Sequence, residues 1–355
     1  MVKYLENDDL ESLAKYMRSS SCRNVFLMRA GVSTSAGIPD FRSPETGLYA
    51  NLARLKLPYP EAVFQINFFR NNPVPFYTLA KELYPGRYRP TVTHSFIKVL
   101  DSHSLLHTCF TQNIDTLERR AGVPDKKIIE AHGSFATQRC IDCKRPYDDE
   151  KMKKVVMESK IPRCEGCNGL VKPDIVFFGE ALPGQFRSSI CSLRDANLLI
   201  VMGTSLTVHP FASLVHFVPE DCPRILINLE EVGDFHRPDD LVCLGDCDDI
   251  VRELCRKLGW EEELEKAWKE TADSVDNEGR MPLADKVEDE KVNDELDKIT
   301  NEVEKFLVIS EEAALASDAP REVGRNEDED EGGKNTEREE EQEPGRNNSS
   351  LAERL

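Results

Sequence analysis

The sequence predicts an α/β protein built on a doubly wound, mostly parallel sheet that carries a small inserted domain. Up to about residue 268, short apolar and β-branched runs such as 25–28 alternate with helical stretches such as 248–258. This rhythm is typical of βαβ units. Two segments interrupt it, a proline-containing stretch at about 42–90 and a cysteine-containing stretch at about 135–172. We therefore expect both segments to leave the sheet as insertions and to form the smaller domain.

The composition narrows the classes of function. The chain has 355 residues and a formal net charge of −19, which argues against a nucleic-acid-binding protein because phosphate affinity depends on clustered Lys and Arg. A basic peptide partner suits this charge better. Apolar runs long enough for a membrane helix are absent, and acidic residues stand near the start of the chain where a signal peptide would be apolar. We expect a cytoplasmic protein with no membrane span.

Four of the eleven cysteines are paired in their spacing. Cys140-x-x-Cys143 and Cys164-x-x-Cys167, separated by twenty residues, match the two turns that bring four thiolates around one Zn²⁺. Four sulfur ligands leave no open coordination position, so the ion is expected to be structural, and a zinc-dependent hydrolase is disfavoured. A redox motif would need only one such pair. The sequence predicts a small zinc-ribbon module in the second insertion.

A loop of small residues follows the first apolar run. Ala30, Gly31 and Ser33 allow backbone N–H groups to approach a pyrophosphate closely. The spacing is not G-x-G-x-x-G, so an ordinary tight turn is the alternative. The residues that follow add a carboxylate, an aromatic ring and a phosphate-binding guanidinium, and together they predict a polyphosphate cofactor. These added residues are Asp40, Phe41 and Arg42.

Polar residues follow four further apolar runs, and in an open α/β sheet ligands bind beyond the carboxyl ends of the strands. The first such segment could instead begin a helix, with Asn113 or Asp115 as its N-cap. His132 could act as a general base near neutral pH or be a structural histidine. Residues 172–180 form an apolar run that we interpret as a core strand. The four polar segments are 111–115, 130–134, 203–205 and 228–230.

The C-terminal part of the chain differs in composition from the rest. Four apolar residues recur at helical spacing in the charged segment 271–310, which predicts an amphipathic helix. This helix could pack back on the body, or act as an export signal or an autoinhibitory element. Residues 311–355 hold fifteen Asp or Glu against six Lys or Arg, which predicts a disordered acidic tail. The four apolar residues are Leu296, Ile299, Val303 and Phe306.

Several motifs together resemble those of a known family. GVSTSAGIPDFRSP, TQNIDTLE, EAHGS, the two cysteine pairs, KPDIVFFGE, GTSL and INLE occur in the order and spacing of the sirtuins, and resemble the fungal cytoplasmic branch of class I. The resemblance covers about 25–260. It implies a catalytic domain at 1–270, with a Rossmann-like large domain and the zinc module.

The activity that this resemblance implies is NAD-dependent protein-lysine deacetylation, a transfer of the acyl group to ADP-ribose. The products would be nicotinamide, free lysine and O-acyl-ADP-ribose. Acyl-lysine proteins such as histone tails would be partners, with a role in transcription regulation if the protein shuttles to the nucleus. NAD would be the co-substrate, and one structural Zn²⁺ would hold the small domain.

The resemblance also implies roles for individual residues. The catalytic pair would be His132, as the base that deprotonates a ribose hydroxyl, and Asn113. The NAD pocket would comprise Ala30, Gly31, Ser33, Asp40, Phe41, Arg42, Gln112, Asn113, Ile114, Asp115, Gly203, Thr204, Ser205, Asn228, Leu229, Glu230 and Cys247. The substrate, added as a strand, would contact Val176, Phe178, Gly179 and Glu180.

One residue departs from the resemblance. The family's loop begins glycine-alanine-glycine, whereas this chain reads Arg29-Ala30-Gly31. If the family's glycine is needed so that the backbone can come close to the phosphates, Arg29 should weaken NAD binding, and Arg29→Gly should strengthen it. If the guanidinium reaches the pyrophosphate, the same substitution should weaken binding. An impaired homologue that survives as a binding or scaffold protein is the alternative function.

Overall fold

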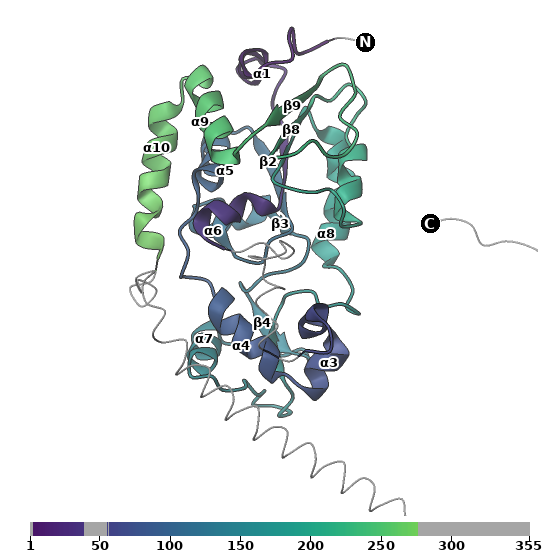
Figure 1. Cartoon of the computed structure of the whole chain (residues 1–355), viewed down its shortest axis with the longest axis vertical. Coiled ribbons are helices and arrows are strands. Elements are labelled where there is room, and N and C mark those ends of the chain that lie inside the picture. Colours follow the sequence, from purple (N-terminus) through teal and green to yellow (C-terminus); the bar gives the residue numbers. More distant parts are fainter. Residues whose placement is uncertain (1–2, 39–54, 56, 276–355) are drawn as a thin grey trace, which may run out of the picture. The chain divides into compact units, whose positions relative to one another are not determined.

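The computed structural model describes residues 3–38, 55 and 57–275, and its centre is a six-stranded sheet (Figure 1). The strand order is β3-β2-β1-β7-β8-β9, and every neighbouring pair in it is parallel. The chain therefore adds strands to one side of β1 and then returns to add strands to the other side. This confirms the predicted doubly wound α/β fold. The strands are β1 (Val25–Arg29), β2 (Leu106–Thr111), β3 (Ile128–Glu130), β7 (Leu198–Met202), β8 (Arg224–Asn228) and β9 (Asp240–Leu244).

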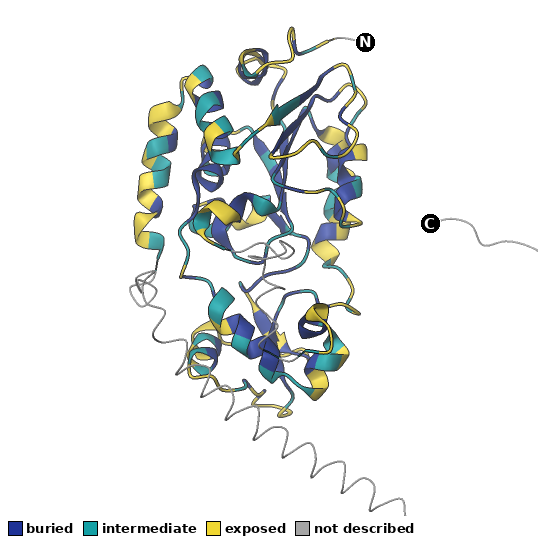
Figure 2. Ribbon diagram, in the orientation of Figure 1, coloured by how far each residue is buried: buried dark blue, intermediate teal, exposed yellow. Residues whose placement is uncertain are grey.

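Helices cover both faces of this sheet, as Figure 1 shows. Successive side chains of a strand point to opposite faces, so Val25 and Leu27 of β1 join one core cluster and Phe26 and Met28 join another. The three central strands β1, β7 and β8 are buried throughout (Figure 2). One face packs against α1 (Leu10–Met17), α5 (Val92–Ser102), α9 (Cys247–Leu258) and α10 (Glu261–Glu270). The other packs against α8 (Gly184–Ser189) and the 3₁₀ turns at Ile190–Asp195 and Phe211–His216.

The two insertions contribute to a separate core. Phe69 and Phe76 from the first insertion pack against Phe177, with ring centroids 5.5 and 4.9 Å away, and Met152 from the second insertion lies in the same cluster. A three-stranded antiparallel sheet of order β5-β4-β6 supports the second insertion. The elements are the 3₁₀ turn Pro60–Phe64, α3 (Ile66–Asn71), α4 (Val74–Leu83), β4 (Gln138–Cys140), β5 (Pro146–Tyr147), α7 (Asp149–Met157) and β6 (Val171–Pro173).

The prediction of one strand across 172–180 is wrong in its extent. Strand β6 ends at Pro173, and beyond it only Phe178 forms a β-bridge, with Gln65. The apolar character of this run comes from Ile175 and Phe177, which are buried in the small-domain core without belonging to a sheet.

The last described element is a 3₁₀ turn at Thr271–Ser274. The predicted amphipathic helix with Leu296, Ile299, Val303 and Phe306, and the acidic tail at 311–355, lie outside the described residues, as do Asp40, Phe41 and Arg42. Among the residues that are described, none of the helices combines the length and apolar character needed to cross a membrane.

Candidate functional site

The predicted polar segments meet at one edge of the sheet. Strands β1, β2, β7 and β8 are parallel, so the residues that follow them emerge at the same edge. The strand order reverses between β1 and β7, and in open α/β sheets this switch point is where a dinucleotide binds. The loops after β1 and β7 are therefore the two loops that meet at the switch point.

Two glycines bring these two loops into backbone contact. The Gly31 N–H donates to the Gly203 carbonyl, and a Cβ on Gly31 would lie only 2.8 Å from that oxygen. Gly203 has φ +59°, and a Cβ there would lie 3.0 Å from the nitrogen of Val32. A side chain is thereby excluded at Gly31 and at Gly203, where the two loops meet. Such a bare backbone fits the close approach that a pyrophosphate requires.

The loop after β8 supplies a second group of residues at this edge. The Asn228 side-chain amide donates to the Glu230 carbonyl at 2.7 Å, and the Asn228 carbonyl accepts from Gly245 N–H at 2.9 Å. Leu229 is 74% exposed. Half-buried Cys247 opens α9, with its Sγ 3.6 Å from the Ile227 carbonyl, and burial raises its pKa to about 12. This mixture of amide, carbonyl and apolar surface suits a nucleoside.

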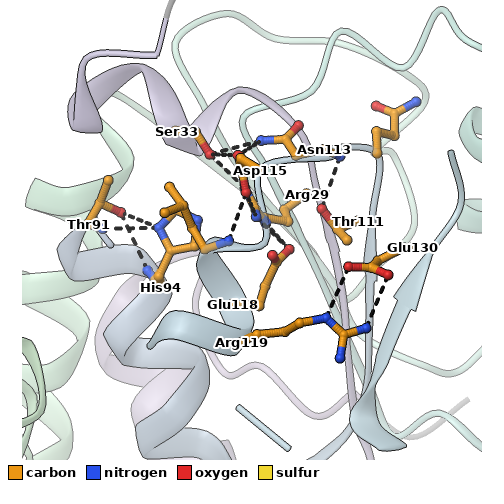
Figure 3. A network of polar contacts seen from close by, with 12 residues as sticks. Arg29, Ser33, Thr91, His94, Thr111, Asn113, Asp115, Glu118, Arg119 and Glu130 are labelled. Atoms are coloured by element: carbon orange, nitrogen blue, oxygen red, sulfur yellow. Dashed lines mark hydrogen bonds and ion pairs between the residues drawn. The ribbon is translucent and has the colours of Figure 1, made fainter. Parts of the chain in front are cut away.

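Three residues predicted to line the NAD pocket, Ser33, Asn113 and Asp115, form a closed hydrogen-bonded cluster, shown in Figure 3. The Ser33 hydroxyl donates to Asp115 Oδ2 at 2.6 Å, and Asn113 Nδ2 donates to the same oxygen at 3.1 Å. Asn113 Nδ2 also lies 2.9 Å from the Ser33 hydroxyl. The cluster joins the loop after β1 to the loop after β2. It offers an amide, a hydroxyl and a carboxylate at a single point beside the crevice.

Arg29 is part of this cluster, and its side chain contacts acidic and hydroxyl groups of the protein. It is the last residue of β1 and is fully buried. Its guanidinium donates to Glu118 at 2.5 Å, to the Ser33 hydroxyl at 3.0 Å and to Asp115 at 3.3 Å. Strand alternation turns the side chain into the protein instead of toward the loop backbone. The guanidinium contacts are therefore made within the protein, and the two expectations for its effect on NAD binding stay predictions.

The charges in this cluster hold one another ionised. Burial alone, the largest influence, would raise the pKa of Asp115. The positive charge of Arg29 and smaller contributions, among them the hydrogen bonds from Ser33 and Leu117, together outweigh burial and leave the pKa below its usual value. Burial alone would lower the pKa of Arg29, but Glu118 and Asp115 together raise it. Asp115 is therefore a carboxylate at neutral pH.

Two members of the cluster's surroundings were not predicted, His94 and Glu118. Each is buried, His94 in α5 and Glu118 in α6 (Leu117–Arg120). Burial and then the charge of Arg29 keep the pKa of His94 well below its usual value, so its ring is neutral. Arg29 was the sequence signal that could have indicated these residues, because a charged residue that ends an apolar strand needs a buried partner.

His132 lies in the loop after β3, joined to the β2 loop. Its Nδ1 is 3.0 Å from the Gln112 carbonyl, which can only accept, so Nδ1 carries the proton and Nε2 has a free lone pair. Burial lowers the pKa of His132 despite that hydrogen bond, so the ring is neutral at pH 7. The next residue, Gly133, has φ +65°, and a Cβ there would collide with the Asp174 carbonyl. The loop is thus held against the small domain.

The segment 176–180 runs from this loop along the small domain. Val176 N–H donates to the His132 carbonyl at 2.8 Å, and the Phe178 side chain is 57% exposed. Gly179 has φ +93°. Glu180 turns inward, where its carboxylate lies 3.0 Å from the buried Lys172 ammonium and accepts from Phe177 N–H at 2.9 Å. Its contacts thus fix the shape of the segment.

The remaining predicted residues are divided between the cores and the loop after β7. Ile114 is buried in the small-domain core. Thr204 is buried, and its hydroxyl accepts from Leu206 N–H at 3.2 Å. The Ser205 hydroxyl is exposed and lies 2.8 Å from that of Thr207. The hydroxyls of Thr204 and Ser205 therefore directly follow Gly203 at the switch point.

The four paired cysteines converge in the small domain. Their Sγ atoms all lie within 4.8 Å of one another, with Cys140–Cys167 at 3.5 Å and Cys143–Cys164 at 3.6 Å. Four sulfurs around Zn²⁺ at about 2.3 Å would be about 3.8 Å apart, so the cluster fits one structural zinc ion. Backbone N–H groups of Gly166 and then Cys167 lower the pKa of Cys164 to about 7, which favours the thiolate.

Comparisons with known proteins agree with this geometry. Residues 29–210 match the sequence model of the Sir2 family. The NAD-dependent protein deacetylase hst2-1 of Emericella nidulans is 54% identical over 309 residues, which cover 86% of each chain. The NAD-dependent protein deacetylase hst2 of Schizosaccharomyces pombe is 48% identical over 87% of this chain and 94% of its own. NAD-dependent protein deacetylase sirtuin-2 of Danio rerio is 48% identical over 78% of each chain. This chain belongs to the Sir2 family, as its motifs predicted.

Proposed function

We propose that this protein is an NAD-dependent protein-lysine deacetylase. The observation that carries the proposal is the state of His132, a neutral ring whose Nδ1 donates to the carbonyl of Gln112, next to Asn113, and whose Nε2 is free. A base in this state, beside a polar cluster at the switch point of a doubly wound sheet, suits proton abstraction from a bound dinucleotide. The family relatives, whose names all give this activity, support it.

NAD, when bound, supplies a bond to nicotinamide that breaks as the acyl-lysine oxygen replaces it. The residues of this chain bind, orient and move protons around that exchange. His132 takes a proton from a ribose hydroxyl through Nε2, and Asn113 orients the ribose. Ser33, Gln112, Ile114 and Asp115 hold the nicotinamide end. The phosphates and adenosine contact Ala30, Gly31, Gly203, Thr204, Ser205, Asn228, Leu229, Glu230 and Cys247, with Asp40, Phe41 and Arg42 as further candidates.

We propose that the substrate peptide lies as an added strand along Val176, Phe178, Gly179 and Glu180. The backbone of such a segment recognises any extended peptide, while exposed Phe178 gives it an apolar contact. The net charge of −19 favours a basic peptide such as a histone tail. We propose a cytoplasmic location with passage to the nucleus, where such a substrate would link the enzyme to transcription regulation.

Nothing in the site supports an inactive scaffold. That alternative depended on Arg29 disturbing the cofactor loop, and its side chain is instead enclosed by Glu118, Asp115 and Ser33. The direct test of the proposal is stoichiometry. We expect one nicotinamide, measured by chromatography, for each lysine deacetylated in an acetyl-lysine peptide. Nicotinamide release without loss of acetyl groups would contradict it and would indicate NAD hydrolysis or ADP-ribosyl transfer.

The activity should fall toward acid pH. His132 acts only when its ring is unprotonated, and the unprotonated fraction falls as pH decreases through its pKa. Because burial lowers that pKa below its ordinary value of 6.5, kcat/KM for NAD should stay level at neutral pH and decline only below pH 6.5. A pH profile of initial rates with saturating peptide checks this. A decline that begins above pH 7 would be incompatible with a buried neutral base.

A further inference from the structure

Arg29 lies at the centre of a buried network that connects three elements of the large domain. Its guanidinium has no exposure to solvent. Nε donates to Glu118 of α6, Nη1 to the Ser33 hydroxyl of the first loop, and Nη2 to Asp115 of the β2 loop (Figure 3). A planar guanidinium can serve several acceptors in fixed directions, which an ammonium cannot.

The same network uses every acceptor position of Asp115. Oδ1 accepts from Leu117 N–H at 2.9 Å and from Arg29, and Oδ2 accepts from Ser33 and Asn113. A carboxylate has about four such positions. Arg29 and the α6 backbone therefore anchor one oxygen, while the other oxygen holds the hydroxyl and amide beside the crevice. The orientation of Ser33 and Asn113 follows from the anchoring of Asp115.

Among the described charged and titratable groups that face Arg29, none is a second cation. The positive charge of Arg29 therefore balances the negative charges of this network. Glu118 and Asp115 are acidic, and Cys109 of β2 is buried with a pKa raised mainly by its burial. His94 of α5 is neutral, and within the described part of the chain its Nε2 has no hydrogen-bond partner. Without Arg29, two buried carboxylates would share the space, and Asp115 would lose its fixed position.

We propose that Arg29 is a positioning residue for the nicotinamide end of NAD. This inference rests on the proposed function. Arg29 fixes Asp115 and Ser33 directly, and Asn113 through them, in the arrangement that receives nicotinamide and its ribose. Within the described residues, the side-chain hydrogen bonds of Arg29 go to Glu118, Ser33 and Asp115. None of them goes to a residue assigned to the phosphates and adenosine, such as Gly203 or Asn228. Its effect should therefore be confined to one end of the cofactor.

This separation gives the test, because ADP has the adenosine and both phosphates of NAD but lacks nicotinamide and its ribose. Arg29→Met/Glu118→Gln replaces the cation and one carboxylate with neutral residues of similar size, which limits the burial of unpaired charge. We expect NAD affinity, measured by titration calorimetry, to fall about tenfold or more. ADP affinity should stay within about twofold of that of the unaltered protein.

Glu118→Gln alone is the matched control. It alters the same buried network but keeps the contacts of Arg29 with Asp115 and Ser33, so the ratio of NAD to ADP affinity should not change. If the double variant does not fold, Arg29→Lys replaces it. Lysine retains the charge without the fork of donors, and we expect about a threefold loss in NAD affinity alone.

Two results would overturn the inference: an affinity ratio in the folded test variant equal to that of the Glu118→Gln control, or a parallel loss for both ligands. In the case that only Arg29→Lys folds, an unchanged ratio would also overturn it. Failure of the proposed function would look different. The unaltered protein would then bind neither NAD nor ADP, and the inference would be rejected with it.

Discussion

Replacement of Cys164 by serine should release zinc and unfold the small domain. The four cysteine sulfurs join two turns, one after β4 and one before β6. The antiparallel sheet around them is slight, since β4 pairs with β5 over two residues and with β6 over three. The metal is therefore expected to supply much of the stability here, and structural Zn²⁺ sites contribute about 10 kcal/mol or more in small zinc-binding peptides.

Metal analysis and thermal unfolding would measure this effect together. We expect one Zn²⁺ per folded chain of the unaltered protein, no zinc in Cys164→Ser, and an early unfolding transition in that variant. Cys191→Ser is the matched control, because Cys191 is an exposed free cysteine outside the module. Its zinc content and melting temperature should equal those of the unaltered protein. Folded protein without zinc, or a Cys164→Ser variant with unchanged melting, would contradict the structural role.

His132→Asn should lower kcat by at least about 10²-fold, the contribution expected of a general base. Asparagine can still donate to the Gln112 carbonyl, as Nδ1 of His132 does, but its amide cannot accept a proton at neutral pH. The loop should therefore keep its shape, and NAD affinity should change little. Steady-state kinetics and calorimetry on the same preparation separate the two effects.

His103→Ala provides the control for this substitution. His103 stacks on Trp260 and pairs with Glu263 at the far end of α5, so its loss should leave kcat unchanged. Near-normal turnover by His132→Asn would remove His132 as the base. A parallel loss of NAD affinity and melting temperature would instead assign it a structural role.

The sequence predicted the structure correctly where residues close together in the chain determine it. Alternating strands and helices predicted the doubly wound sheet, because each strand of a parallel sheet needs a covering helix before the next. The spacing of Cys140, Cys143, Cys164 and Cys167 predicted the zinc module because two short turns are enough to place four ligands. The strand-end segments were likewise visible in the sequence, since their position follows from the strands.

The sequence was misleading where distant residues decide the structure. Arg29 was interpreted from its neighbours in the loop, but the carboxylates that hold it, Asp115 and Glu118, are 86 and 89 positions away. The run 172–180 was interpreted as a strand from its apolar character, but Phe177 is buried by packing against Phe69 and Phe76. Neither contact leaves a local pattern in the sequence.

The central claim, NAD-dependent removal of acyl groups from lysine, is tested most directly by mass spectrometry of an acetyl-lysine peptide. The unaltered full chain is incubated with the peptide in the presence and absence of NAD, and both peptide and small-molecule products are measured. We predict loss of the acetyl group and appearance of O-acetyl-ADP-ribose only with NAD. An unchanged peptide in the presence of NAD, or deacetylation without it, would contradict the account.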